Sequence, residues 1–171
     1  MTDFLQLAHD RYSVRAFSDA PVEAEKIEAL VDAAIAAPTA VNRQPWHLWV
    51  VTDSDAVARL PALTRFSFGA RTILMLGAAP DEAWTRKYDG RNFADVDASI
   101  VGTHIMLAAH DLGLGTTWVG HFDAPAVHEA FPEAAGYDLV ALFPIGYPAA
   151  DAAPSAAHLE HKSTEELATR L

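Results

Sequence analysis

Cysteine is absent from the 171-residue sequence, which excludes disulfide bonds, thiolate metal ligands and a cysteine nucleophile. Long hydrophobic runs are absent as well, because the longest strongly apolar segment, residues 73–79, is far too short to cross a bilayer. The first five residues have neither the basic start nor the apolar stretch of a secretory signal. These absences favour a cytoplasmic protein without a membrane partner.

Positive charge is scarce. The 12 lysines and arginines stand against 23 aspartates and glutamates, which gives a formal net charge of −11. Such a surface repels nucleic acid and anionic lipid, so we expect neither as a partner. An acidic protein that binds an anionic ligand must gather its few cations locally, and Arg11 and Arg15 lie within one five-residue stretch.

Two common kinds of catalytic site lack their sequence patterns. None of the eight histidines has an acidic partner at a recognisable ligand spacing, and no His-Glu-x-x-His element is present. No serine lies in a Gly-x-Ser-x-Gly elbow. We therefore expect no bound metal and no serine hydrolase.

The pattern of apolar residues predicts one α+β domain over residues 1–171, with a small mixed sheet packed by helices. One helix is expected to open at Pro21, with Asp19 as its cap, and to end before Pro38. The other expected elements are helix 4–10, strand 46–51, helix 55–63, strand 71–76, helix 94–112, strand 116–119, helix 124–131, strand 139–145 and a short helix from residue 164. Residues 79–90 are expected to form a loop.

Two features indicate a homodimer. The predicted helix 94–112 is apolar on nearly all sides, which is typical of a helix that is buried on most sides. In so short a chain, that burial points to a second subunit. The tail over residues 149–163 is rich in alanine and proline, so we expect it to be extended and to lie across the partner.

Three polar segments can carry chemistry. Residues 11–15 place two guanidiniums and a hydroxyl where they can converge on a phosphate, although a solvated surface turn would look the same. Residues 37–46 form a loop with a proline near each end. Its amides and hydroxyls can form hydrogen bonds with the polar edge of a heterocycle. Alternatively, the loop only connects a helix to a strand. In residues 111–123, glycines permit close backbone approach to a flat ligand.

Together and in this order, the segments resemble the nitroreductase family of FMN enzymes. The resemblance covers nearly the whole chain, through RYSVRAF (11–17), AAPTAVNRQPWHLWVV (36–51), DASIVGTHIMLAAHDLGLGTTWVGHFD (97–123), ALFPIGYP (141–148) and HLEHKSTEEL (158–167). It implies an α+β nitroreductase-like fold with a mixed or antiparallel central sheet flanked by helices, in an intertwined homodimer. It also implies bound FMN, with NAD(P)H as the electron donor.

Carried onto this sequence, the resemblance implies a cofactor site built from both ends of the chain. Arg11 and Ser13, with Tyr12 between them, would hold the FMN phosphate, and Arg15 would lie at the pyrimidine edge of the flavin. Near the carboxyl terminus, His161 and Lys162 occupy the place of an Arg-Lys pair that lies by the phosphate. Because histidine loses its charge as the pH rises, phosphate binding through this pair would weaken at higher pH.

The resemblance assigns the remaining cofactor contacts to the middle of the chain. After Pro38, the residues Thr39, Ala40 and Asn42 would approach the flavin of the other subunit. The backbone N–H groups of Gly120 and His121 would face flavin N5 and O4.

The function that the resemblance implies is hydride transfer from NAD(P)H, through FMN, to a small electron-poor acceptor such as a nitroaromatic or a quinone. Trp84, Tyr88 and Phe122 are candidates for the wall of the acceptor pocket, or they are ordinary packed aromatics. Alternatives with the same residues are a non-catalytic FMN carrier or sensor and a specialised reductase for dehalogenation or unsaturated bonds. A flavin-free interaction protein is a third class.

Overall fold

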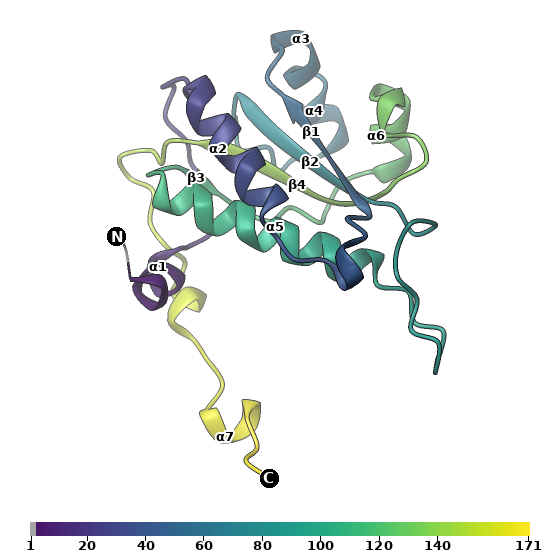
Figure 1. Ribbon diagram of the computed structural model, residues 1–171. Coiled ribbons are helices and arrows are strands. Elements are labelled where there is room, and N and C mark those ends of the chain that lie inside the picture. Colours follow the sequence, from purple (N-terminus) through teal and green to yellow (C-terminus); the bar gives the residue numbers. More distant parts are fainter. Residues whose placement is uncertain (1–2) are drawn as a thin grey trace.

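A four-stranded antiparallel sheet lies at the centre of the structure, with the strand order β1-β2-β4-β3 (Figure 1). The computed structural model describes residues 3–171. The strands are β1 (Trp46–Val51), β2 (Thr72–Ala78), β3 (Gly115–Thr116) and β4 (Asp138–Gly146). The α+β class with a small central sheet is therefore confirmed, and every pair of named strands is antiparallel.

Helices cover both faces of the sheet. Along β2, Leu74 and Leu76 pack with α2 (Ala24–Ile35) and α5 (Ala94–Asp111), whereas Ile73 and Met75 pack on the other face with α4 (Leu60–Leu63) and α6 (Ala124–Ala130). Successive strand residues point to opposite faces, and both faces of β2 are covered. This is why residues 73–79 form an unbroken apolar run.

Most of the expected elements are present, with shifted ends. The remaining helices are α1 (Phe4–Asp10), α3 (Ser54–Val57), α7 (Thr164–Leu167) and the short 3-10 turns η1 (Ala40–Asn42), η2 (Pro132–Ala134) and η3 (Ala156–Leu159). The expected helix 55–63 is divided into α3 and α4, and Pro61 lies in the first turn of α4. Proline is tolerated there because the N–H groups of a helix's first turn have no acceptor within the helix.

The expected start of α2 is wrong. The helix begins at Ala24 with Glu23 as its N-terminal flanking residue, so Pro21 lies outside it. Asp19 is therefore too far from the helix start to cap it, and its carboxylate pairs with Arg71 at 3.0 Å. The expected strand 116–119 is interrupted. Gly115 and Thr116 pair with β4, and the chain returns to β4 at Val119, which exchanges two hydrogen bonds with Leu142 at 3.0 Å.

Helix α5 is buried along one face and incompletely covered on the other. Val101, Ile105 and Ala109 are fully buried in the core. Val96 and Ile100 remain partly exposed and line a shallow hollow with Asp95, Ser99 and Thr103. A single chain therefore leaves an apolar strip of α5 uncovered, as expected if a second subunit packs there.

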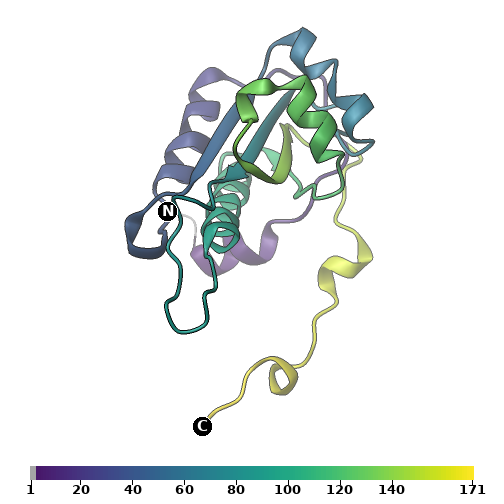
Figure 2. The ribbon, with the colours of Figure 1, turned by 90° about the vertical axis from the view of Figure 1, so that its right-hand side faces the viewer.

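Two segments extend from the body of the molecule (Figure 2). Residues 79–93 form an arm with a bridge between Thr85 and Asn92, and the tail after β4 runs away from the sheet before α7. Within residues 3–171, no helix combines the length and apolar character needed to cross a bilayer. The cytoplasmic location stays a prediction.

A hydrogen-bond cluster fastens α2 to the ends of α5 and β4. Lys26 Nζ donates to the Leu112 carbonyl at 2.8 Å and to the Tyr147 hydroxyl at 2.8 Å. The Tyr147 hydroxyl in turn donates to the Glu23 carboxylate at 2.7 Å. This bond is the main reason why the pKa of Glu23 is lowered from its ordinary value of 4.5.

We expect Tyr147→Phe to lower Tm by a few degrees at pH 7, because it removes the hydroxyl that joins Lys26 to Glu23. A carboxylate whose pKa is lowered on folding stabilises the fold above its ordinary pKa, and this contribution is lost as the pH falls through the folded-state pKa. The difference in Tm between the variant and the wild type should therefore narrow below pH 4.5.

Thermal unfolding followed by circular dichroism over a pH series measures this difference. Tyr137→Phe is the matched control, because the Tyr137 hydroxyl makes no hydrogen bond within residues 3–171. A Tm difference for Tyr147→Phe that stays constant from neutral to acid pH would contradict the assigned role of Glu23.

Candidate functional site

The amino-terminal segment 11–17 lies along the sheet edge formed by β3. Ser13 forms a parallel bridge with Thr116, and the Val14 N–H donates to the Thr116 carbonyl at 2.9 Å. Further along, Phe17 bridges to Pro148. The structure thus brings together the arginine-rich first segment and the glycine-rich third segment, which are about 100 residues apart in the sequence.

Gly115 makes this close approach possible. A Cβ atom at Gly115 would lie 2.6 Å from Cγ2 of Val14, well inside van der Waals contact. A similar constraint acts at Gly102 of α5, where a Cβ atom would lie 2.5 Å from the Trp118 ring. The two glycines therefore fix how closely segment 11–17 approaches β3 and how Trp118 packs on α5.

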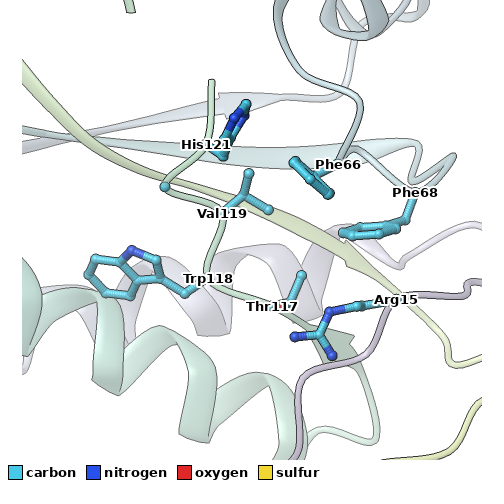
Figure 3. Close-up of a pocket in the computed structure, with 8 residues that line it drawn as sticks. Arg15, Phe66, Phe68, Thr117, Trp118, Val119 and His121 are labelled. Atoms are coloured by element: carbon cyan, nitrogen blue, oxygen red, sulfur yellow. The ribbon is translucent and has the colours of Figure 1, made fainter. Parts of the chain in front are cut away.

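A cleft of about 210 Å³ opens beside this junction (Figure 3). It is lined by Arg15, Phe66, Phe68, Thr117, Trp118, Val119, Gly120 and His121. The Arg15 side chain extends toward Thr117, whereas the Trp118 ring points away from Arg15 and the two phenylalanines. Of the sequence-predicted residues, Arg15, Gly120 and His121 thus meet in one cleft.

A second hollow adjoins the cleft and shares Arg15 with it. Its lining consists of Arg11, Tyr12, Ser13, Arg15, Ser155, Ala157 and His158. All four residues predicted from segment 11–15 therefore line one hollow. We call it the cationic hollow.

The cationic hollow has charge available for a ligand. Neither Arg11 nor Arg15 forms an ion pair within residues 3–171, and Arg15 donates only to the Ser13 carbonyl, at 3.2 Å. Two guanidiniums without a carboxylate, together with a serine hydroxyl, are a donor set suited to a phosphate.

The tail residue in the cationic hollow is His158. Its ring lies 6.4 Å from the Tyr12 ring, and its Nε2 is 3.2 Å from the His9 carbonyl. His161 and Lys162 lie beyond η3, are exposed, and line neither hollow within the chain. Their phosphate role stays a prediction, and sequence reasoning missed His158 because only the turn of the tail places it beside Tyr12.

Gly120 lies in the open part of the cleft. A Cβ atom there would have no neighbour closer than 3.9 Å, and the residue does not have a positive φ. Neither packing nor backbone conformation within the chain therefore requires glycine at this position. A flat ligand that approaches the backbone N–H group would require it.

Phe66 and Phe68 form a wall of the cleft that the sequence analysis did not identify. The Phe66 ring lies 5.4 Å from the His121 ring in an edge-to-face arrangement and 5.9 Å from the Phe68 ring. Phe68 has a φ of 53°, an uncommon conformation for a bulky residue. Phe122, a predicted pocket residue, lines a neighbouring hollow that shares His121 with the cleft.

The second polar segment lies elsewhere. Ala40 N–H donates to Oδ1 of Asp97, a carboxylate that is 1% exposed in the first turns of α5. Segment 11–17 instead meets β3 beyond the other end of α5, and the helix from Asp97 to Asp111 is about 20 Å long at 1.5 Å per residue. None of Pro38, Thr39, Ala40 and Asn42 lines the cleft or the cationic hollow of its own chain.

This loop holds a strained conformation. Val41, Asn42 and Gln44 have φ values of 48°, 56° and 52°, and a β-branched residue such as Val41 rarely adopts this region. The Val41 side chain is 71% exposed although it is apolar. Two hydrogen bonds hold the loop in place. Gln44 N–H donates to Thr39 Oγ1 at 3.0 Å, and Ala40 N–H donates to Asp97 Oδ1.

Trp84 and Tyr88 lie on the arm and do not line the cleft of their own chain. Trp84 packs edge-to-face on Phe93, with ring centroids 5.0 Å apart. Tyr88 is 86% exposed. Any contribution of these two residues to an acceptor pocket would have to come from a second chain.

The family model and a curated relative both match this chain to nitroreductases. The sequence profile of the nitroreductase family matches residues 8–68 and 62–147. A protein of Archaeoglobus fulgidus named "Putative NADH dehydrogenase/NAD(P)H nitroreductase" is 31% identical over 157 residues, covering 86% of this chain and 87% of its own length.

Solved structures share the fold. A nitroreductase family protein from Clostridium difficile 630 superposes with a TM-score of 0.90 at 31% identity, and 98% of each chain is covered. A Desulfovibrio desulfuricans protein crystallised in complex with FMN has a TM-score of 0.80 at 24% identity, with coverage of 100% of this chain and 98% of that one.

We expect Gly115→Ala to destabilise the fold by about 1–3 kcal/mol, because the added methyl group overlaps Val14 and pushes segment 11–17 from β3. Gly120→Ala is the matched control, since its methyl group enters open space. Urea unfolding compares the two free energies of unfolding. Equal stability of the two variants would show that the close packing at Gly115 is not required.

Proposed function

The chain belongs to the nitroreductase family, and on that premise we propose that it is an FMN-dependent oxidoreductase that passes hydride from NAD(P)H to a small electron-poor acceptor. One observation carries this proposal. The unpaired guanidiniums of Arg11 and Arg15 lie in a hollow that adjoins a cleft containing the unobstructed backbone of Gly120.

The donor set fits the two chemically different parts of FMN. Arg11 and Ser13 offer charge-assisted hydrogen bonds to the phosphate, and His158 and Tyr12 line the same hollow. The cleft offers aromatic side chains at Phe66 and Phe68 for the flat ring system. Because Arg15 lines both spaces, one cofactor that extends from the hollow into the cleft would meet both sets of groups.

When bound, FMN supplies the hydride chemistry, which no side chain of this site provides. The residues of the chain position the cofactor and set its electrostatics. We assign to the Arg15 guanidinium the stabilisation of negative charge at the pyrimidine edge. We assign to the backbone N–H groups of Gly120 and His121 hydrogen bonds to N5 and O4. Without a side chain at Gly120, the ring face stays accessible to the donor and the acceptor in turn.

The choice of donor and acceptor follows the relatives. The Archaeoglobus fulgidus protein carries NADH and NAD(P)H nitroreductase in its name, and a Methanothermobacter thermautotrophicus relative with the same name is 29% identical over 151 residues. We therefore propose NAD(P)H as donor and nitroaromatics or quinones as acceptors. The open cleft favours an enzyme over an FMN carrier, which would have no need of an accessible ring face.

We further propose that the active form is a homodimer in which each site draws on both chains. The supporting observations are the partly exposed strip of α5 at Val96 and Ile100 and two exposed apolar residues, Val41 (71%) and Leu159 (80%). Because loop 38–44 lies at the far end of α5 from its own cationic hollow, Asn42 reaches a flavin only in the partner chain.

Arg11→Ala should weaken FMN binding by roughly 1.5–3 kcal/mol, the contribution of a hydrogen bond to a charged group. Equilibrium titration followed by flavin fluorescence gives the dissociation constant. Arg71→Ala is the control, because it removes the same charge from a residue paired with Asp19 outside both hollows. If both variants bind FMN as the wild type does, Arg11 does not hold the phosphate.

Mixed dimers test the shared site. Arg11→Ala should damage the site of its own chain, whereas Asn42→Ala should damage the site of the partner. In a dimer that contains one of each, one site carries both defects and the other carries none. Random pairing should therefore restore roughly a quarter of the sites in the mixture.

Co-expression of the two variants with different affinity tags provides the mixed dimers, and NAD(P)H oxidation per bound FMN provides the readout. Activity of the purified mixed dimer at the mean of the two parental variants would place Asn42 in its own chain's site or outside any site.

A further inference from the structure

A third hollow, of about 380 Å³, adjoins the cleft at His121. It is lined by Pro61, Ala62, Leu63, Thr64, Arg65, His121, Phe122 and Asp123. We call it the Arg65 hollow. Because His121 lines both the cleft and the Arg65 hollow, a substrate seated in the cleft can extend past His121 into this space.

Hydrogen bonds fix the Arg65 hollow to the cleft. The Thr64 hydroxyl donates to the His121 carbonyl at 2.8 Å, and the Asp123 N–H donates to the Leu63 carbonyl at 3.0 Å. Thr64 is buried, with 7% of its surface exposed. Residues 63–64 and 121–123 thus form one connected wall, which holds Arg65 at a defined place relative to the cleft.

Arg65 presents a guanidinium that no carboxylate of residues 3–171 pairs with. Its Cζ atom lies 4.8 Å from the centroid of the Phe66 ring, a cation–π contact that orients the group but occupies none of its hydrogen-bond donors. Within residues 3–171, Arg65 forms no ion pair and no side-chain hydrogen bond.

The acidic residue of the hollow has another partner. Asp123 Oδ1 accepts the Ala126 N–H at 3.1 Å and caps α6. One oxygen of its carboxylate is therefore engaged at the helix start, and Asp123 forms no ion pair with Arg65 within residues 3–171.

The negative net charge of the protein makes the position of Arg65 selective for anionic substrates. On a surface with a net charge of −11, an anionic substrate is repelled almost everywhere, and a local cation beside the cleft concentrates it there. Arg15 lines the cleft and Arg65 lines the hollow that adjoins it, and neither arginine carries an ion pair within residues 3–171.

We propose that Arg65 is a specificity-determining residue that binds an oxyanion, either a phosphate or a carboxylate, of the substrate that occupies the cleft. The proposal rests on the proposed function and names the charge class of its substrate. The phosphates of NAD(P)H are one source of this group, and a carboxylate on the acceptor is the other.

Steady-state kinetics of the FMN-loaded protein separates these two sources. Arg65→Gln is compared with Arg71→Gln, which removes an equal charge from an arginine outside the three hollows. The donors are NADPH, NADH and the uncharged 1-benzyl-1,4-dihydronicotinamide. The acceptors are 4-nitrobenzoate and the neutral nitrobenzene, both assayed with the uncharged donor.

Arg65→Gln removes a charge-assisted contact, so it should raise KM roughly tenfold and leave kcat unchanged. This rise is expected either for the charged donors or for the charged acceptor, and not for their uncharged counterparts. A rise for NADPH and NADH identifies a donor phosphate, and a rise for 4-nitrobenzoate identifies an acceptor carboxylate. The proposal is overturned if KM changes equally for charged and uncharged substrates, or if KM changes no more in Arg65→Gln than in Arg71→Gln.

A binding measurement keeps this proposal separate from the proposed function. Titration of the holoprotein with pyrophosphate and with benzoate, followed by the side-chain Nε–H resonance of Arg65 in NMR spectra, should give a saturable shift with one of them. Absence of a shift with both anions overturns the role of Arg65, whatever the activity. A wild-type protein that shows this shift but reduces no acceptor would contradict the oxidoreductase proposal alone.

Discussion

The close contact between segment 11–17 and β3 is the constraint on which the candidate site depends. The contact consists of the Val14 hydrogen bond to Thr116 and of packing that Gly115 permits only because it has no Cβ atom. It places Arg11 and Arg15 next to the segment that follows β3, residues 117–121. The cationic hollow and the cleft become neighbours as a result, although their residues come from distant parts of the sequence, 11–15, 66–68, 117–121 and 155–158.

Helix α5 separates the loop that carries Asn42 from the cationic hollow. Asp97, near the start of the helix, holds the strained loop that carries Asn42, and the cationic hollow lies beyond its last turn. A single chain therefore keeps two complementary parts apart. The uncovered strip of α5 and the exposed Val41 give a second chain an apolar surface to pack on. On this account, dimerisation does more than add stability, because it completes each site.

The sequence predicted the parts of the fold and the site that depend on local patterns. The buried strand β2 followed from its unbroken apolar run, α5 followed from apolar residues at helical spacing, and the scarcity of cations pointed directly to Arg11 and Arg15. Contacts between distant segments left no such pattern. Phe66 and Phe68 resemble ordinary core aromatics until the fold places them against His121. His158 is one of eight histidines until η3 brings it beside Tyr12. The start of α2 was missed because Pro21 fits a first turn equally well, whereas the tertiary bond from Tyr147 to Glu23 accompanies a start at Ala24.

The central claim is that this arrangement holds FMN with one ring face open to both substrates. Anaerobic titration of the purified, FMN-supplied protein tests it most directly through the flavin absorption band. We predict that flavin stays with the protein through gel filtration, that one equivalent of NADH or NADPH bleaches the band, and that a nitroaromatic or quinone restores it. Protein that leaves the column colourless after incubation with excess FMN would contradict the account.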